Sequence, residues 1–149
     1  MRFIANGMLG GLGKTLRMLG INCTFFSGPE EKLIITARQE GRTVLTRNTK
    51  LRGKEGVIFI KGLKVIDQLR ELDKKLSIRE EFRPLSRCLI CNVEIIPIEK
   101  VEVKDRVPYY TFLHFEKFYS CPICQRIYWD GSHKKQMEQR IKRIIDALD

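Results

Sequence analysis

Long apolar runs are absent from this chain of 149 residues, and acidic side chains are fewer than basic ones. No apolar run approaches the roughly 20 residues that a helix needs to span a bilayer. The first 20 residues carry basic side chains and are interrupted by glycines, which is not the pattern of a secretory leader. We therefore expect a cytoplasmic protein that is neither secreted nor bound to a membrane.

The imbalance between basic and acidic residues leaves a strong positive charge. Lys and Arg number 28 against 18 Asp and Glu, so the formal net charge is +10. The excess lies almost entirely before residue 85. A field of this sign attracts polyanions, nucleic acid first and acidic lipid second. The alternative is a generic basic surface with no polyanionic partner.

The chain contains enough apolar residues (43%) for a packed core, which excludes a wholly disordered protein. Up to residue 83, apolar runs typical of strands alternate with amphipathic helical patterns. This order predicts an α/β fold, with a mostly parallel sheet flanked by helices and ligands bound at the carboxyl ends of its strands. The expected strands are 1–5, 21–26, 43–46 and 57–60, and the expected helices are 9–19, 30–40 and 65–76.

Cysteine spacing gives the first specific signal. Four of the five cysteines form two C-x-x-C pairs, Cys88 with Cys91 and Cys121 with Cys124. Two such knuckles complete a four-thiolate structural zinc site with no open position. Disulfides and an iron–sulfur cluster are the alternatives. Cys23 lies in an apolar run and is interpreted as a small buried hydrophobic residue.

The composition changes near residue 84, where a second unit is expected to begin. Short β-rich runs at 94–103 and 109–118 separate the knuckles and predict a small β-rich zinc ribbon built from hairpins. Ser132 is expected to cap a last helix whose apolar face, built around Ile141, packs back on the body. The predicted organisation is therefore a first domain at 1–83, a zinc ribbon at 84–131 and a C-terminal helix at 132–149.

Several motifs resemble those of the Mut-seven C-terminal RNase domain family. They are Phe3-Ile-Ala-Asn6-Gly-Met-Leu9, Leu16-Arg-Met-Leu-Gly20, Glu40-Gly-Arg-Thr-Val-Leu-Thr-Arg47, Ser86-Arg-Cys-Leu-Ile-Cys-Asn92 and Cys121-Pro-Ile-Cys-Gln-Arg-Ile-Tyr-Trp-Asp-Gly-Ser-His133. The resemblance runs in order through nearly the whole chain. It implies a PIN-like ribonuclease fold followed by a zinc ribbon.

The resemblance also implies a reaction, the hydrolysis of RNA phosphodiesters with Mg²⁺ or Mn²⁺ held by a few carboxylates. Carried over to this chain, the acidic positions fall at 6, 30 and 48. Only Glu30 is acidic, because Asn6 and Asn48 stand at the other two. An amide oxygen can bind a cation but brings no charge. The sequence therefore indicates a degenerate cleavage site.

Alternatives to this interpretation remain open at the level of sequence. The asparagines fit a natural relative that lost cleavage, or a chain in which Asp was replaced by Asn. An active Mg²⁺- or Mn²⁺-dependent endoribonuclease with a different ligand set is the second hypothesis. A zinc-ribbon module that binds proteins within a ribonucleoprotein is the third. Asn22 also stands where relatives often carry Asp, but it begins its strand, at the edge away from the expected site.

Basic residues near the expected site are the candidates for binding RNA, the expected partner, for example ribosomal or transfer RNA. Each of them has the alternative role of a solvated surface residue. Nothing in the sequence indicates a homo-oligomer. The candidates are Lys14 and Arg17 on the first helix, Arg47, Lys50 and Arg52 after the third strand, and Lys134 on the last helix.

Overall fold

A four-stranded parallel sheet organises the first half of the computed structural model, which describes residues 1–149. Its strands are β1 (Arg2–Ala5), β2 (Asn22–Phe25), β3 (Thr43–Thr46) and β4 (Val57–Phe59), in the spatial order β2-β1-β3-β4. The register pairs Ile4 of β1 with Thr24 on one side and Val44 on the other. Because all strands are parallel, their carboxyl ends meet at one edge of the sheet.

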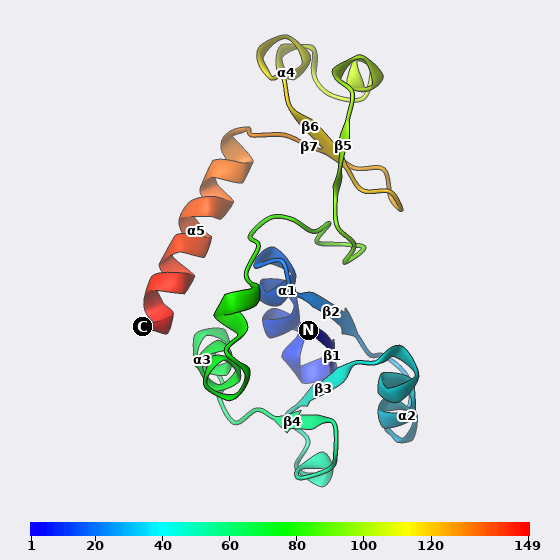
Figure 1. Ribbon diagram of the computed structural model, residues 1–149, viewed down its shortest axis with the longest axis vertical. Helices are drawn as coiled ribbons and strands as arrows, with labels where there is room; N and C mark the ends of the chain where they lie inside the picture. The colour runs from blue at the N-terminus through cyan, green and yellow to red at the C-terminus, as the bar shows by residue number, and fades with distance from the viewer.

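Helices cover both faces of this sheet (Figure 1). Phe3 and Ala5 of β1 belong to the larger core, which also takes side chains from α1 (Gly10–Met18) and α3 (Val65–Leu76). Ile4 points to the opposite face and packs with Leu33 and Ala37 of α2 (Glu30–Glu40). Alternate residues of one strand thus enter different cores, as the period of two requires.

Short 3-10 helices follow the strands and shape the sheet edge. Asn6 caps η1 (Gly7–Leu9), which leads into α1, and Asn48 caps η2 (Thr49–Leu51). Helix α2 ends at Gly41, whose φ of 64° lies in the left-handed region that glycine adopts without strain. A further 3-10 helix, η3 (Ile78–Glu81), follows α3.

The second half contains a three-stranded antiparallel sheet of β5 (Ile96–Ile98), β6 (Phe118–Ser120) and β7 (Ile127–Tyr128). The expectation of β-rich structure across 109–118 is wrong for most of that run, because α4 (Tyr109–His114) occupies it. Pro108 precedes this helix, and the rings of Tyr110 and His114, one turn apart, stack at 4.0 Å. The run 94–103 contains only β5 and η4 (Lys100–Val103).

The last helix, α5 (Ser132–Leu148), runs from the ribbon back along the body and packs against α3 (Figure 1). Ile141 and Leu148 join the larger core, and Arg70 of α3 donates to the carbonyl of Ala147. The expected Ser132 cap is wrong by one residue, since Gly131 is the N-cap. A Cβ at Gly131 would lie 2.8 Å from Nε1 of Trp129, so close packing of the indole requires glycine there.

These elements confirm the expected fold class, an α/β unit with a mostly parallel sheet, followed by a small β-rich unit and a C-terminal helix. No helix has both the length and the apolar character needed to cross a membrane.

Candidate functional site

The carboxyl edge of the parallel sheet brings together the three residues that the sequence singled out. Asn6 directly follows β1, and Asn48 lies two residues after β3. The two strands are neighbours, and the Asn6 N–H donates to the carbonyl of Leu45 at 3.0 Å. Glu30 begins α2, the helix that follows β2 on the other side of β1.

Thr46 is the buried link between the two asparagines. Its hydroxyl oxygen accepts a hydrogen bond from the Asn6 side-chain amide at 3.3 Å and from the Asn48 backbone N–H at 3.0 Å. The residue is fully buried. The sequence analysis missed Thr46 as a site residue, although its place at the end of β3, two residues before Asn48, was a usable signal.

The Asn48 side-chain amide also donates to a carboxylate oxygen of Glu30. Asn6, Glu30, Thr46 and Asn48 therefore form one hydrogen-bonded group, which we call the sheet-edge cluster. The amide oxygens of the two asparagines are used as well. Asn6 Oδ1 accepts from the Gly7 N–H at 2.8 Å, and Asn48 Oδ1 accepts from the Lys50 N–H at 3.0 Å.

The charge of the sheet-edge cluster comes from Glu30 alone. An aspartate at position 48 would place a second carboxylate against Glu30, and such a pair needs a shared proton or a cation between its members. The Asn48 amide instead satisfies Glu30 through its own N–H. Helix capping is preserved at both positions, because Asn and Asp cap equally well. Asparagine at these positions thus carries less charge than aspartate would and still accepts the capping hydrogen bonds.

The predicted basic residues differ in how available they are. Lys14, Lys50 and Arg52 are exposed, and the Arg52 guanidinium lies 5.1 Å from the centre of the Phe59 ring. Arg47 is half-buried and donates to the carbonyl of Lys61 at 3.4 Å. Lys14 belongs to α1, whereas the other three follow β3 directly and lie in the segment that contains Asn48.

Lys134 lies elsewhere, in the first turn of α5 beside the ribbon, where it pairs with Asp130. It is half-buried and lines a cavity between these two elements.

Arg17, a candidate RNA contact in the sequence, has its guanidinium bonded within the protein. Only 8% of the residue is exposed. Its Nε donates to the carbonyl of Cys23 at 2.7 Å, and its Nη1 donates to the carbonyls of Leu89 and Ile90 at 2.9 and 3.1 Å. Arg17 therefore joins α1 and β2 to the first cysteine knuckle.

Asn22 stands at the start of β2, at the opposite end of the strand from the sheet-edge cluster. Its side-chain oxygen accepts from Arg42 at 2.6 Å and from the Asn92 amide at 2.8 Å. The Asn92 side-chain oxygen in turn accepts from the backbone N–H of Cys23 at 3.0 Å. The first knuckle thus covers the free edge of β2, which would otherwise expose unpaired backbone groups.

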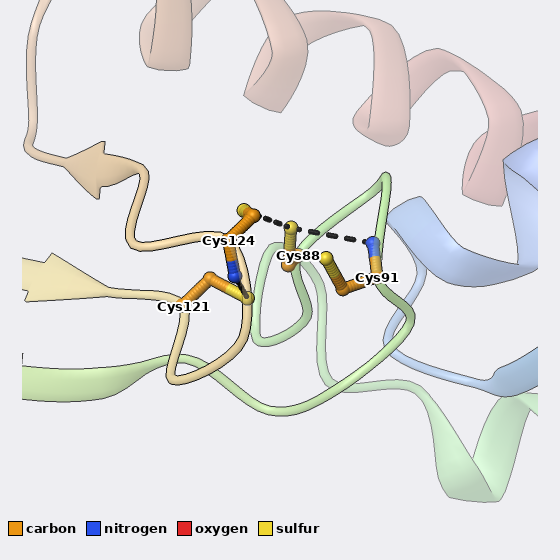
Figure 2. A group of neighbouring side chains, drawn as sticks. All are labelled: Cys88, Cys91, Cys121 and Cys124. Atoms are coloured by element: carbon orange, nitrogen blue, oxygen red, sulfur yellow. Dashed lines mark hydrogen bonds between the residues drawn. The ribbon is translucent and has the colours of Figure 1, made fainter.

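The four predicted cysteine ligands converge on one point, as Figure 2 shows. All four sulfurs lie within 4.8 Å of one another, and those of Cys88 and Cys124 are 3.7 Å apart. Thiolates at about 2.3 Å from a tetrahedral ion are separated by about 3.8 Å, so the spacing fits one zinc ion. It is too long for a disulfide, whose sulfurs are about 2.05 Å apart. A multi-iron cluster would hold its cysteines farther apart.

The two knuckles have the same backbone geometry. In each, the N–H of the first cysteine donates to the carbonyl five residues later, at 2.9 Å for Cys88 and 3.0 Å for Cys121. The residue after each pair, Asn92 or Gln125, has a φ near 60°. Backbone N–H groups also point at sulfur, with Ile123 and Cys124 both 3.4 Å from the Cys121 Sγ.

Hydrogen bonds favour the thiolate form, which metal binding needs, at Cys88 and Cys124, whereas burial raises the pKa of Cys91 to about 12. The backbone N–H of Arg126 is the main cause that lowers the pKa of Cys124 to about 6. The Tyr128 hydroxyl donates to the Cys88 sulfur at 3.1 Å, and burial together with this bond raises the tyrosine pKa. The four cysteines could therefore hold a metal ion such as zinc. They are the only group of three or more His, Cys, Asp or Glu side chains at ligand spacing.

Comparison with known proteins supplies the family. The family model described as the Mut7-C RNAse domain matches residues 1–141, which include the sheet-edge cluster and all four clustered cysteines. Neither a search of curated proteins nor a search of solved structures returns a match. Since the match spans nearly the whole chain, the protein belongs to the Mut7-C RNase domain family.

Proposed function

We propose that this protein binds RNA through the carboxyl edge of its parallel sheet, and that its metal-dependent cleavage centre is degenerate. The supporting observation is the sheet-edge cluster. Two of its members carry an amide where the family resemblance implies a carboxylate, and one of these amides donates directly to Glu30. With a single negative charge, the cluster offers little to offset a divalent cation beside a phosphate.

Retention of RNA binding is supported by the charges near the same edge. Lys50 and Arg52 are exposed, and Arg47 is half-buried close to Asn48. Such side chains bind phosphates without reading the base sequence. Contacts between these basic side chains and phosphates do not require a metal ion, so RNA binding is expected even where cleavage is lost.

We further propose that the four cysteines hold one structural zinc ion. Four protein thiolates leave no open position for a water or a substrate, so the ion would have no catalytic role. When bound, it would fix the two knuckles relative to each other. The first knuckle is hydrogen-bonded to Arg17 and, through Asn92, to β2, so this rigidity would extend to the edge of the parallel sheet.

A salt titration of RNA binding tests the proposal. The logarithm of the binding constant for single-stranded RNA is expected to fall with the logarithm of the salt concentration. The expected slope is about −3 if roughly four phosphates are contacted. Lys50→Ala is expected to reduce the slope by about 0.7, whereas Lys142→Ala, the matched control on α5, leaves it unchanged. Absent or salt-independent binding contradicts the proposal and favours a protein-binding module.

A cleavage assay tests the second half of the proposal. The unmodified protein with Mn²⁺ is expected to leave structured and single-stranded RNA intact. Cleavage that Glu30→Ala abolishes would contradict a degenerate centre and would support the alternative, an active endoribonuclease with other ligands.

A further inference from the structure

A cavity of about 910 Å³ lies between the ribbon and the start of α5, far along the chain from the sheet-edge cluster. We call it the ribbon–α5 cleft. Three segments line it: residues 83–95 with the first knuckle, β6 and β7 of the ribbon, and the turn and helix from Trp129 to Met137. Its volume lies within the range of roughly 300–1,000 Å³ that ligand pockets occupy.

Aromatic rings form part of the wall of the cleft. Trp129, Tyr119 and Tyr128 all line it, and each is half-buried. The indole of Trp129 lies beside the Phe118 ring, with the ring centres 6.4 Å apart and the planes tilted by 51°, and its Nε1 edge is in close contact with Gly131. Its Nε1–H donates no hydrogen bond within the chain. A ring fixed in this way is preorganised to stack on a planar ligand.

The remaining wall is cationic. Four lysine or arginine side chains line the cleft against two carboxylates, and one of these, Asp130, is already paired with Lys134. Arg87 is used internally, because it donates to the carbonyls of Gly20 and Asn92. Arg83 is exposed and its guanidinium has no partner in the chain. Residues 131–134, at the start of α5, line the cleft, and this first turn carries no acidic residue and no side-chain cap to offset the positive end of the helix dipole.

We propose that the ribbon–α5 cleft binds a nucleotide, with the base stacked on Trp129 and the phosphate held by Arg83 at the start of α5. A planar base suits the rings, and an anion suits the guanidinium and the helix start. The nucleotide is either free or one unit of an RNA strand. The strand version rests on the proposed function and gives the protein a second RNA contact, remote from the sheet edge.

The chain contains a single tryptophan, and it lines the cleft. Trp129 fluorescence therefore reports on this cavity directly in the 149-residue chain, to which zinc is added for the four cysteines. The probes are adenosine and uridine 5′-monophosphate, ribose 5-phosphate, and a single-stranded RNA oligomer. We expect saturable quenching by the nucleotides or the oligomer and none by ribose 5-phosphate, which has no base to stack.

Charge reversal in the cleft supplies the matched comparison. Arg83→Glu is expected to lower the affinity for the ligand that quenches Trp129 by roughly tenfold, which corresponds to the loss of one charge-assisted contact to phosphate. Lys142→Glu makes the same charge change on α5 outside the cleft and is expected to have little effect. Because Trp129→Ala could disturb the ribbon, Trp129→Phe is the conservative variant, and binding of labelled RNA is expected to persist in it.

The outcomes separate this proposal from the proposed function. Quenching by a mononucleotide supports the cleft even if RNA binding at the sheet edge fails. Quenching by the oligomer alone, weakened in Arg83→Glu, supports the strand version. If RNA binds in a gel-shift assay but leaves Trp129 emission unchanged, and Arg83→Glu behaves like Lys142→Glu, the cleft proposal is wrong while the proposed function stands. No response to any probe also overturns it and points to a protein ligand.

Discussion

Thr46 is the residue on which the geometry of the sheet-edge cluster depends. Its hydroxyl is fully buried and satisfies two donors from different segments, the Asn6 amide and the Asn48 backbone. Convergence of positions 6, 30 and 48 was predictable, because the carboxyl ends of neighbouring parallel strands meet at one edge. The hydroxyl link was not, since a threonine at a strand end is also an ordinary β-forming residue.

Thr46→Val tests this link at the residue scale. The change keeps the shape of the side chain but leaves two donors without their acceptor, so we expect a loss of about 1–3 kcal/mol in the free energy of unfolding. Urea denaturation measures it. Thr43→Val, on the same strand and without a side-chain hydrogen bond, is the control, and an equal loss in both variants would contradict the role given to Thr46.

Arg17 and Lys14 show why charge alone did not assign RNA contacts. Both are basic residues of α1, but Lys14 is exposed and Arg17 is buried under the first knuckle. Helical spacing places Arg17 on the same side as Lys14, three positions earlier, yet two of the carbonyls that it binds come from residues 89 and 90, far away in the sequence. Only the tertiary arrangement reveals them.

Substitution of these two residues is expected to separate stability from binding. Arg17→Met removes a guanidinium that donates to three buried or half-buried carbonyls, and we expect a loss of about 2–4 kcal/mol in the free energy of unfolding. Lys14→Met is expected to leave stability within about 0.5 kcal/mol and to weaken RNA binding modestly. Thermal denaturation and RNA titration of both variants give the answer. A stable Arg17→Met protein with reduced RNA affinity would reverse the assignment.

At the scale of elements, the two cysteine knuckles were the most predictable feature. Their spacing fixes a tight turn and the ligand geometry together, so the sequence specified both. The helix α4 was not predictable, because Tyr, Thr and Phe dominate its sequence and favour strands. Pro108 before it and the stacked pair of Tyr110 and His114 favour the helix instead.

Removal of the proposed zinc ion tests the knuckle pair. Thiolates bind zinc and thiols do not, so acidification is expected to release the ion, at a pH below about 6, the pKa of Cys124 in the metal-free protein, because protons must compete with the bound metal. A chelating indicator measures the released zinc, and circular dichroism follows unfolding. We expect one zinc per chain above pH 7 and a loss of several kcal/mol in stability when it is removed.

Cys23 provides the control for this experiment. It is buried away from the clustered sulfurs, and burial raises its pKa to about 11. Cys23→Ala is therefore expected to bind zinc with unchanged stoichiometry, whereas Cys88→Ser is expected to lose it. If the free energy of unfolding is unchanged after a chelator has removed zinc, the proposed structural role of the ion at the four cysteines is wrong.

At the scale of the whole molecule, the positive net charge and the sheet-edge cluster both bear on the charge of the proposed RNA-binding edge. The net charge of +10 favours contact with a polyanion, and Asn6 and Asn48 leave the edge more positive than the two carboxylates that the family resemblance implies. Asn6 and Asn48 accept the capping hydrogen bonds of both 3-10 helices, as aspartates would, so asparagine at these two positions is compatible with the fold. The proposed function therefore treats affinity for RNA and the capacity to cleave it as separable properties of this fold.

Manganese-dependent stabilisation tests this account most directly. The unmodified protein and the double variant Asn6→Asp with Asn48→Asp are heated with and without Mn²⁺. Without metal, the variant is expected to melt at a lower temperature than the unmodified protein, because the carboxylate introduced at position 48 repels the Glu30 carboxylate. Bound Mn²⁺ is expected to stabilise the folded variant by about 2.7 kcal/mol when the Mn²⁺ concentration is a hundred times the dissociation constant. The melting temperature of the unmodified protein is expected not to change with Mn²⁺. Equal stabilisation of both proteins by Mn²⁺, or of neither, would contradict a cation site lost through these two asparagines.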